Sequence, residues 1–300
     1  MQKLPGGLIH VNVVGCALFA AISGSSAATV ATVGKMSIPE LRKRKYPEKI
    51  LLGSLAGSGT LGLLIPPSII LIIYGVAVQE SIAKLFIAGI IPGIMIALIF
   101  MSYVIIWSLI NKKDMPKIFE EYSLFEKIRR SKQLLPVIIL IAAVIGSIYT
   151  GIATATEAAS LGVVGALILS FFQKSLSIET FKSSLLGATK TSCMIAFILA
   201  GSTFLSLAMG FTGLPRNLAI WIESMNLSPY VLIFVLMIFY IILGMFLDGI
   251  SAVVLTMAII EPMIRQAGFD MIWFGVFLVI VVEMAQITPP VGFNLFVLQG

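Results

Sequence analysis

Long apolar runs separated by short polar stretches make up nearly the whole chain, and their lengths predict how each crosses a membrane. About 20 helical residues span roughly 30 Å of hydrocarbon. Uninterrupted runs predict membrane-spanning helices at residues 82–110, 134–150, 154–172 and 192–211. The pattern therefore predicts an all-α integral membrane protein.

Four other apolar runs are interrupted. The run 8–34 is split by Ser23-Gly24-Ser25-Ser26, so that each of its halves is too short to span. The run 230–264 is split by Asp248-Gly249. We expect these two runs to form re-entrant helical hairpins. The runs 50–78 and 271–297 each contain a Pro-Pro pair. Proline lacks an N–H and clashes with the preceding helical turn, so these two runs predict broken helices.

The interruptions occur twice in the same order. Gly24 precedes Pro66 by 42 positions, and Gly249 precedes Pro289 by 40. A polar tip followed at nearly equal distance by Pro-Pro indicates an internal repeat. We expect a first repeat at 1–110, a linker at 111–133 and a second repeat at 134–300.

The positions of lysine and arginine predict the orientation of the two repeats. These residues concentrate in the stretches 35–49, 111–133 and 174–190, whereas 214–228 carries only Arg216. Basic loops stay in the cytoplasm, so the first hairpin enters from the cytoplasm and the second from outside, as an inverted repeat requires. Apolar residues at helical spacing in 111–133 predict a surface arm helix there.

Composition supports lipid as the solvent. The chain is 59% hydrophobic and 11% charged, against about 25% charged residues in soluble domains. Its net charge of +6 does not indicate nucleic-acid binding, because the basic residues lie in short loops between apolar runs. Cys16 and Cys193 lie in apolar stretches and are expected to be small buried hydrophobes. His10, the single histidine, has no activated serine placed beside it for protease chemistry and is expected at a polar interface.

The interruptions also carry candidate chemistry. A broken helix leaves carbonyl and N–H groups without partners, and in lipid each costs several kcal/mol unless it is satisfied. Oxygens that converge there offer a cage for a small hard cation, and helix N-termini offer a weak anion site. Small residues also allow close helix packing, which remains the alternative for any single serine. The candidate polar groups are Ser23, Ser25, Ser26, Thr288 and Asp248.

Three carboxylates lie in or near apolar segments. A charge at mid-bilayer costs at least about 2.5–3.5 kcal/mol, so Asp248 is expected to be functional, either as a cation ligand or as a cap of the second half-helix. Glu157 near a span end is as compatible with a helix N-terminal role as with a functional one. Glu283, one turn before the second break, is either paired or faces a lumen.

Several ordered motifs resemble the large membrane subunit of TRAP transporters, DctM type. The resemblance covers essentially the whole chain. It is carried by Pro5-Gly6-Gly7, residues 19–34, Lys45-Tyr46-Pro47, residues 59–68 ending in Ile65-Pro66-Pro67-Ser68, residues 88–93, Ala155-Thr156-Glu157-Ala158-Ala159, Gly244-Met245-Phe246-Leu247-Asp248 and Thr288-Pro289-Pro290-Val291-Gly292.

This resemblance implies a sodium-driven, elevator-type secondary transporter in the bacterial inner membrane. Such systems take up an organic acid, such as a C4-dicarboxylate or a sialic acid, from a periplasmic substrate-binding protein and need a small membrane subunit of DctQ type. A symporter that needs no binding protein and a non-transporting membrane scaffold remain alternatives.

The resemblance also implies particular site residues. A sodium ion, as the transported coupling ion, would be held by Ser23, Ser25, Gly62, Ile65 and Pro67. By repeat symmetry, a second sodium site would contain Asp248, Ile250, Ala285, Thr288 and Pro290. At the two hairpin tips, Ser26, Gly249 and Ser251 are the candidates for substrate binding.

Two departures from the family stand out. Its members usually continue for one or two more spans at each end, so the chain is expected to be a truncated form. Ala155 stands where the family usually has proline, which is expected to alter local rigidity more than function.

Overall fold

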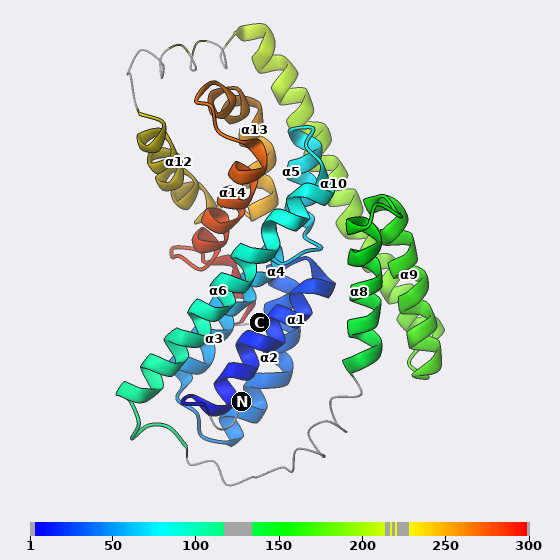
Figure 1. Cartoon of the computed structure of the whole chain (residues 1–300), viewed down its shortest axis with the longest axis vertical. Coiled ribbons are helices and arrows are strands. Elements are labelled where there is room, and N and C mark those ends of the chain that lie inside the picture. Colours follow the sequence, from blue (N-terminus) through cyan, green and yellow to red (C-terminus); the bar gives the residue numbers. More distant parts are fainter. Residues whose placement is uncertain (1–3, 117–133, 214–216, 218–219, 221–227, 299–300) are drawn as a thin grey trace. The chain divides into compact units, whose positions relative to one another are not determined.

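The computed structural model describes residues 4–116, 134–213, 217, 220 and 228–298. Within these residues it contains helices and no β-strand (Figure 1). The chain folds as two compact units. One comprises Met1–Ile118 with Ser202–Gly300, and the other comprises Phe119–Gly201.

The first interrupted run folds as a helical hairpin. A 3-10 turn, Gly7–Ile9, leads into α1 (His10–Ser23), and α2 (Ser26–Lys43) returns beside it (Figure 1). The chain reverses at Gly24, whose φ of 59° lies in the left-handed region that glycine adopts without strain. Ser25 then caps α2, because its hydroxyl accepts a hydrogen bond from the backbone N–H of Ala28 at 3.4 Å.

The first broken helix and the span after it are confirmed. The broken helix consists of α3 (Glu48–Gly59), α4 (Leu61–Leu64) and α5 (Ile69–Ala77), with a bend of 41° at the break. The Pro66-Pro67 peptide bond in the break is cis. The span α6 (Ile82–Ile110) has the bounds that the apolar run predicted.

The second hairpin and broken helix follow the same order. The hairpin is α12 (Pro229–Gly244) with α13 (Gly249–Gln266), and the broken helix is α14 (Met271–Gln286) with the short α15 (Phe293–Val297). The Pro289-Pro290 bond in the second break is cis. These elements share one compact unit with those of the first half, so the division into repeats at 1–110 and 134–300 stays a prediction.

The other unit is built on α8 (Leu135–Tyr149) and α9 (Ala155–Phe172), which pack against each other. Leu140 of α8 fills the space beside Gly165 of α9. Thr154 and Glu157 form a capping box at the start of α9, with Glu157 Oε2 accepting the N–H of Thr154 at 2.8 Å. The helix N-terminal role of Glu157 is therefore confirmed.

Two predicted boundaries are wrong. The basic stretch 35–49 was expected to be a loop, but α2 continues through Pro39 to Lys43. The connector 174–190 and the span 192–211 were expected to be separate, but Ile178–Thr212 is one helix, α10. At 1.5 Å per residue its 35 residues extend about 52 Å, more than the hydrocarbon thickness. Polar residues therefore continue a membrane helix instead of ending it.

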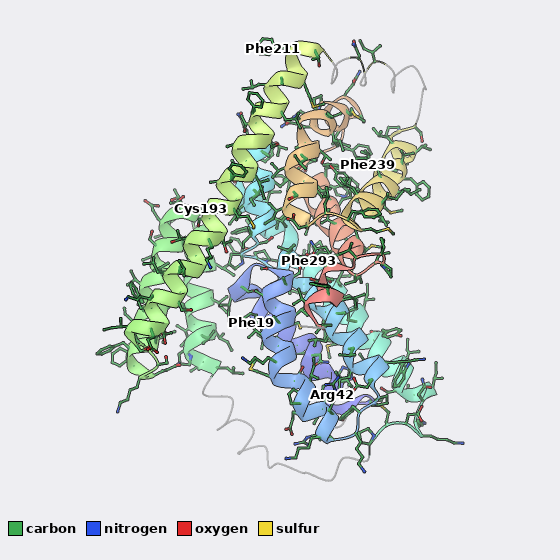
Figure 2. All side chains as sticks on the ribbon, turned by 180° about the vertical axis from the view of Figure 1, so that it is seen from behind. Phe19, Arg42, Cys193, Phe211, Phe239 and Phe293 are labelled. Carbon is green, nitrogen blue, oxygen red and sulfur yellow. The ribbon has the colours of Figure 1, made fainter. Side chains whose placement is uncertain are left out.

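Several helices of the described chain are long and apolar enough to cross a membrane. These are α6, α9, α10 and α13, with the bent helix Glu48–Leu64 and Ile69–Ala77 as a fifth candidate. Large hydrophobic side chains point outward, as Phe211 and Phe239 do in Figure 2, which suits lipid as the solvent. Most of 111–133, where an arm helix is predicted, lies outside the described residues. The same holds for most of 214–228.

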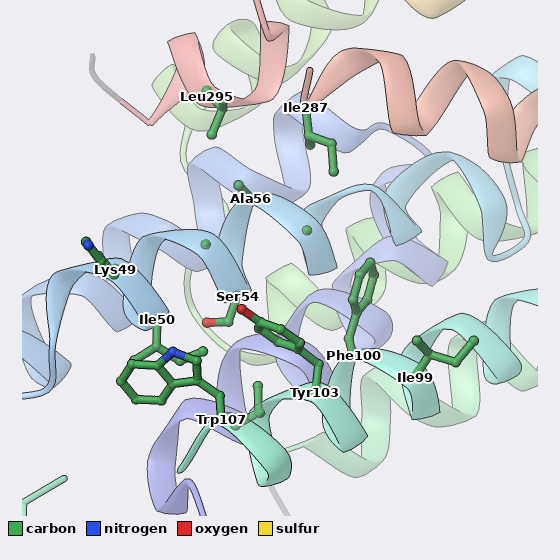
Figure 3. A pocket seen from close by; sticks show the side chains of 13 residues that line it. Lys49, Ile50, Ser54, Ala56, Ile99, Phe100, Tyr103, Trp107, Ile287 and Leu295 are labelled. Carbon is green, nitrogen blue, oxygen red and sulfur yellow. The ribbon is translucent and has the colours of Figure 1, made fainter. Parts of the chain in front are cut away.

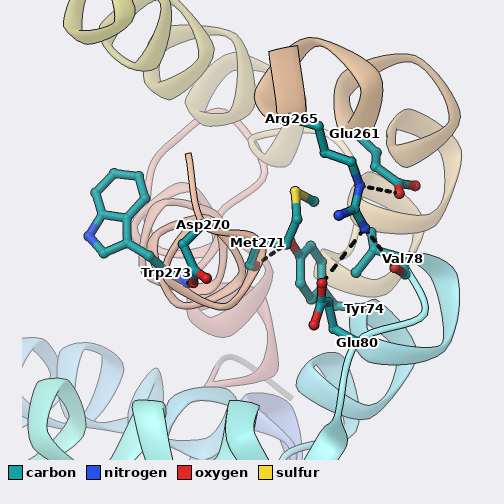
Figure 4. Close-up of polar contacts among 8 residues, drawn as sticks. All are labelled: Tyr74, Val78, Glu80, Glu261, Arg265, Asp270, Met271 and Trp273. Atoms are coloured by element: carbon teal, nitrogen blue, oxygen red, sulfur yellow. Dashed lines mark hydrogen bonds and ion pairs between the residues drawn. The ribbon is translucent and has the colours of Figure 1, made fainter. Parts of the chain in front are cut away.

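Polar contacts tie the two sequence halves together at one end of the larger unit. The Tyr74 hydroxyl donates to the carbonyl oxygen of Met271 at 2.7 Å. Arg265 of α13 donates to the carbonyl oxygen of Val78 at 3.2 Å and forms ion pairs with Glu80 and Glu261 (Figure 4). These contacts hold the ends of α5, α13 and α14 in a fixed arrangement.

Candidate functional site

The first hairpin tip lies directly against the first helix break. The N–H of Ile69, which begins α5, donates to the carbonyl oxygen of Gly24 at 3.2 Å. A Cβ added to Gly24 would lie 2.8 Å from the carbonyl oxygen of Pro67. The tip and the break, more than 40 positions apart in the sequence, thus meet through their backbones.

At Gly62, the backbone of α4 comes still closer to the first hairpin tip. A Cβ at this position would lie 2.6 Å from the carbonyl oxygen of Ser25 and 2.7 Å from the hydroxyl oxygen of Thr29. Real Cβ atoms do not approach other heavy atoms so closely. Only glycine therefore allows α4 to approach the hairpin tip in this arrangement.

Three oxygen atoms gather at this contact. The Ser25 carbonyl oxygen accepts hydrogen bonds from the hydroxyls of Thr29, at 2.8 Å, and Ser23, at 3.2 Å. The two hydroxyl oxygens lie 2.7 Å from each other. Uncharged carbonyl and hydroxyl oxygens are the ligand type that hard cations prefer. Thr29 was not among the site residues predicted from the sequence, although it is a polar residue one helical turn after Ser25.

The remaining predicted residues of this site contribute backbone. Ile65 ends α4 in extended conformation, with ψ of 122°, and its side chain lies against Gly93 of α6. The Pro67 carbonyl oxygen faces Gly24. The structure thus brings together Ser23, Ser25, Gly62 and Pro67. Ile65 could contribute to the site only with its main chain, because its side chain lies against Gly93.

Ser26, predicted to bind substrate, is buried in this conformation. Its hydroxyl donates to Glu283 Oε1 of α14 at 2.5 Å, and both residues are at least 96% buried. Glu283 is therefore paired, which decides between the two alternatives for this residue. Its second oxygen, Oε2, has no hydrogen-bond partner among the described residues. A substrate would reach Ser26 only after this contact opened.

At the second tip, Asp248 caps α13. Its Oδ2 accepts the N–H groups of Ile250 and Ser251, each at 3.1 Å, and its Oδ1 accepts the Ser251 hydroxyl at 2.5 Å. Both carboxylate oxygens thus satisfy groups of the helix N-terminus. This geometry supports the capping role of Asp248, and it also engages the hydroxyl of Ser251, another predicted substrate residue.

The second tip packs on the last turn of α14. A Cβ on Gly249 would lie 2.6 Å from Nε2 of Gln286. A Cβ on Gly244 would lie 2.6 Å from the Cβ of Ala285. Thr288, beyond the end of α14, is half-buried and donates its hydroxyl to the carbonyl oxygen of Met284 at 2.7 Å. Pro290 is exposed. In the described chain no hydrogen bond joins Asp248 to Thr288, so the second predicted site is less assembled than the first.

Two other expectations have clear outcomes. His10 is buried rather than interfacial, and its Nε2 lies 2.8 Å from the carbonyl oxygen of Pro5. Cys16 is buried as expected, but Cys193 is exposed on α10.

A cavity of about 570 Å³ lies elsewhere, mainly between α3 and α6 (Figure 3). None of the predicted ion or substrate residues lines it, although it reaches Ile287 at the second break. It is therefore separate from the oxygen cluster at the first tip.

The described residues form apolar helices with two hairpins and two broken helices, an arrangement expected of a membrane transport protein. The comparison with known proteins identifies the family. Residues 3–300 match the tripartite ATP-independent periplasmic transporter, DctM component, and the chain belongs to this family.

Its relatives are large permease subunits. The chain is 36% identical over 294 residues to the C4-dicarboxylate TRAP transporter large permease protein DctM of Pseudomonas aeruginosa, covering 97% of this chain and 68% of that protein. It is 32% identical to the 2,3-diketo-L-gulonate TRAP transporter large permease protein YiaN of Escherichia coli, covering 99% and 69%. It is also 32% identical to the isethionate TRAP transporter permease protein DctMQ of Oleidesulfovibrio alaskensis, covering 100% and 47%.

Proposed function

We propose that the chain forms the sodium-coupled permease core for uptake of an organic acid. The observation that carries this proposal is the convergence of the Ser25 carbonyl with the Ser23 and Thr29 hydroxyls against Gly62. These oxygens are uncharged, and a bound sodium ion would be partly dehydrated by them. Because they come from a hairpin tip held against a broken helix, binding the ion would fix the tip in place.

The coupling would follow from this arrangement. With no ion, the two hydroxyls donate to the Ser25 carbonyl. A cation in the cluster would turn the hydroxyl hydrogens outward and draw the three oxygens around itself. Sodium would then stabilise the arrangement in which the tip rests on α4 and α5, and substrate would bind more tightly to that arrangement. Movement of the loaded tips across the membrane would complete an elevator cycle.

The substrate is proposed to be an organic anion. The relatives named above are described as permeases for C4-dicarboxylate, 2,3-diketo-L-gulonate and isethionate, all of them organic acids. The N-termini of α2 and α13 both begin at hairpin tips. Helix N-termini carry partial positive charge, and this charge would favour an anion between the two tips, with Gly249 allowing close approach.

The partners are proposed from the family. A tripartite transporter includes a periplasmic substrate-binding protein and a small membrane subunit, and one relative is named as a DctMQ permease. We expect this chain to need both, in the inner membrane. A symporter that works without a binding protein remains the alternative.

The test is uptake into proteoliposomes that contain the full-length permease with its small subunit. A thermal-shift screen of organic acids on the binding protein first supplies the substrate. Uptake should require both an inward sodium gradient and the binding protein. Uptake that persists with potassium in place of sodium would overturn the sodium coupling, and uptake without the binding protein would favour the alternative symporter.

A further inference from the structure

The cavity between α3 and α6 has two chemically different ends. Lys49, Tyr103 and Trp107 line one end, with the Lys49 ammonium group directed outward, and Phe100, Ile99 and Ile287 line the other (Figure 3). Lys49 belongs to the first turn of α3, and Trp107 to the last turn of α6. The cavity is thus amphipathic along the direction in which these helices cross the membrane.

Small residues of α3 create the hollow. Gly53, Ala56 and Gly57 line it on the α3 side, and a Cβ on Gly57 would already lie 3.3 Å from the Phe100 ring of α6. A Cβ on Gly53 would meet no atom within 4 Å. The space beside Gly53 is therefore open, and an apolar chain can lie in it without displacing the protein.

Lysines lie at the polar end of the cavity or close to it in the sequence. Lys49 is exposed and makes no ion pair among the described residues, whereas its neighbour Glu48 is paired with Arg42 at 2.7 Å. Lys45 precedes α3, and Lys112 and Lys113 follow α6 directly. The positive-inside distribution assigns these lysines to the cytoplasmic side, where the leaflet carries anionic lipids.

We propose that this cavity binds an anionic phospholipid of the cytoplasmic leaflet. One acyl chain would lie along Gly53 toward Phe100, and the phosphate would meet the Lys49 ammonium group, with the Trp107 and Tyr103 side chains at headgroup depth. The apolar lining excludes a small organic acid, which needs buried polar partners. Lys49 supplies the charge complementarity that favours an anionic over a zwitterionic headgroup.

The occupancy can be measured through Trp107. In the full-length permease with Trp221→Phe and Trp273→Phe, Trp107 would be the emitting tryptophan within residues 1–300, and any tryptophan outside them would also be replaced. The protein is reconstituted in vesicles of brominated phosphatidylglycerol or brominated phosphatidylcholine. Phosphatidylglycerol should quench Trp107 at least twofold more strongly than phosphatidylcholine at equal mole fraction.

Two variants test the contact with the lipid headgroup and the contact with the acyl chain independently. Lys49→Gln should bring the quenching ratio of the two lipids close to one, while total quenching remains. Gly53→Leu should fill the cavity and lower quenching by both lipids at least twofold. Gly187→Leu is the matched control, because its added side chain also meets no atom within 4 Å but lies on α10.

The outcome that overturns the proposal is equal quenching by the two lipids in the parent protein. Quenching that Gly53→Leu leaves unchanged would likewise show that no acyl chain occupies the cavity. Lys49→Gln alters an exposed side chain, so it keeps the proposal testable if Gly53→Leu fails to fold.

Discussion

At the scale of single residues, the oxygen atoms of the first tip have distinct origins. Ser25 contributes its carbonyl because Gly24 reverses the chain just before it, and Gly62 lets α4 lie against that carbonyl. Thr29 contributes a hydroxyl from one turn further along α2. The chemistry of the tip therefore depends on two glycines that carry no functional group.

Asp248 gives a residue-scale prediction. Its carboxylate caps α13 through the N–H groups of Ile250 and Ser251, and asparagine is nearly as good a cap. Asp248→Asn should therefore leave the sodium concentration for half-maximal uptake within threefold of the wild-type value. Asp248→Ala should lower stability by about 1 kcal/mol through loss of the cap.

Uptake against sodium concentration, with thermal unfolding of the same samples, checks both expectations. A tenfold rise in half-maximal sodium for Asp248→Asn, about 1.4 kcal/mol, would instead make Asp248 a direct sodium ligand.

Some site residues were predictable from the sequence and others were not. Ser23 and Ser25 lie in an interruption of an apolar run, so local pattern made them candidates. Gly62 and Pro67 were expected only from the family resemblance. The Ser26–Glu283 contact joins residues 257 positions apart, and nothing near either residue indicates its partner. Gln286 was missed for the same reason, because its contact with Gly249 exists only after the second hairpin packs on α14.

At the scale of elements, the interruptions were predictable because they have local causes. Prolines break α3–α5 and α14–α15, and polar tips split the two hairpin runs, although α13 itself is long and apolar enough to cross a membrane. The helix ends were harder to predict. Charged residues such as Lys35 and Lys182 indicated loops, yet α2 and α10 continue through them, because a helix that leaves the membrane can carry polar side chains into water.

The link between the first hairpin and α14 gives a prediction at this scale. Ser26→Ala removes the donor to Glu283 and leaves a buried oxygen without a partner, which costs about 1–3 kcal/mol. We expect a clear fall in the thermal unfolding temperature of the full-length protein in detergent. Ser102→Ala is the control, because that exposed hydroxyl binds only the Leu98 carbonyl of its own helix.

Equal unfolding temperatures for Ser26→Ala and Ser102→Ala would mean that the Ser26–Glu283 contact contributes nothing to stability. The first hairpin would then be held by its other packing contacts, which include α3, α6 and α15 as well as the first break.

At the scale of the whole molecule, orientation in the membrane follows from charge. The Lys/Arg distribution assigns the ends of α2 and α6 to the cytoplasm, and the broken helix between them places residues 78–81 outside. Cysteines at Lys43 and Lys113 should therefore resist a membrane-impermeant thiol reagent in intact cells, and a cysteine at Gln79 should react.

The labelling is done on a background without Cys16 and Cys193, with permeabilised cells as the control for reactivity. External labelling at position 43 would reverse the orientation and remove the support for inverted repeats.

The central claim, a sodium ion held at the first hairpin tip, is tested most directly through Thr29. Thr29→Val keeps the shape of the side chain and removes its hydroxyl, whereas Thr29→Ser keeps the hydroxyl. Thr189→Val is a matched control, because Thr189 on α10 also donates to the carbonyl four residues before it at 2.8 Å. The measurement is substrate uptake against sodium concentration with all partner proteins present. The account predicts at least a tenfold rise in half-maximal sodium for Thr29→Val, about 1.4 kcal/mol, and nearly wild-type curves for Thr29→Ser and Thr189→Val. An unshifted sodium curve for Thr29→Val would contradict it.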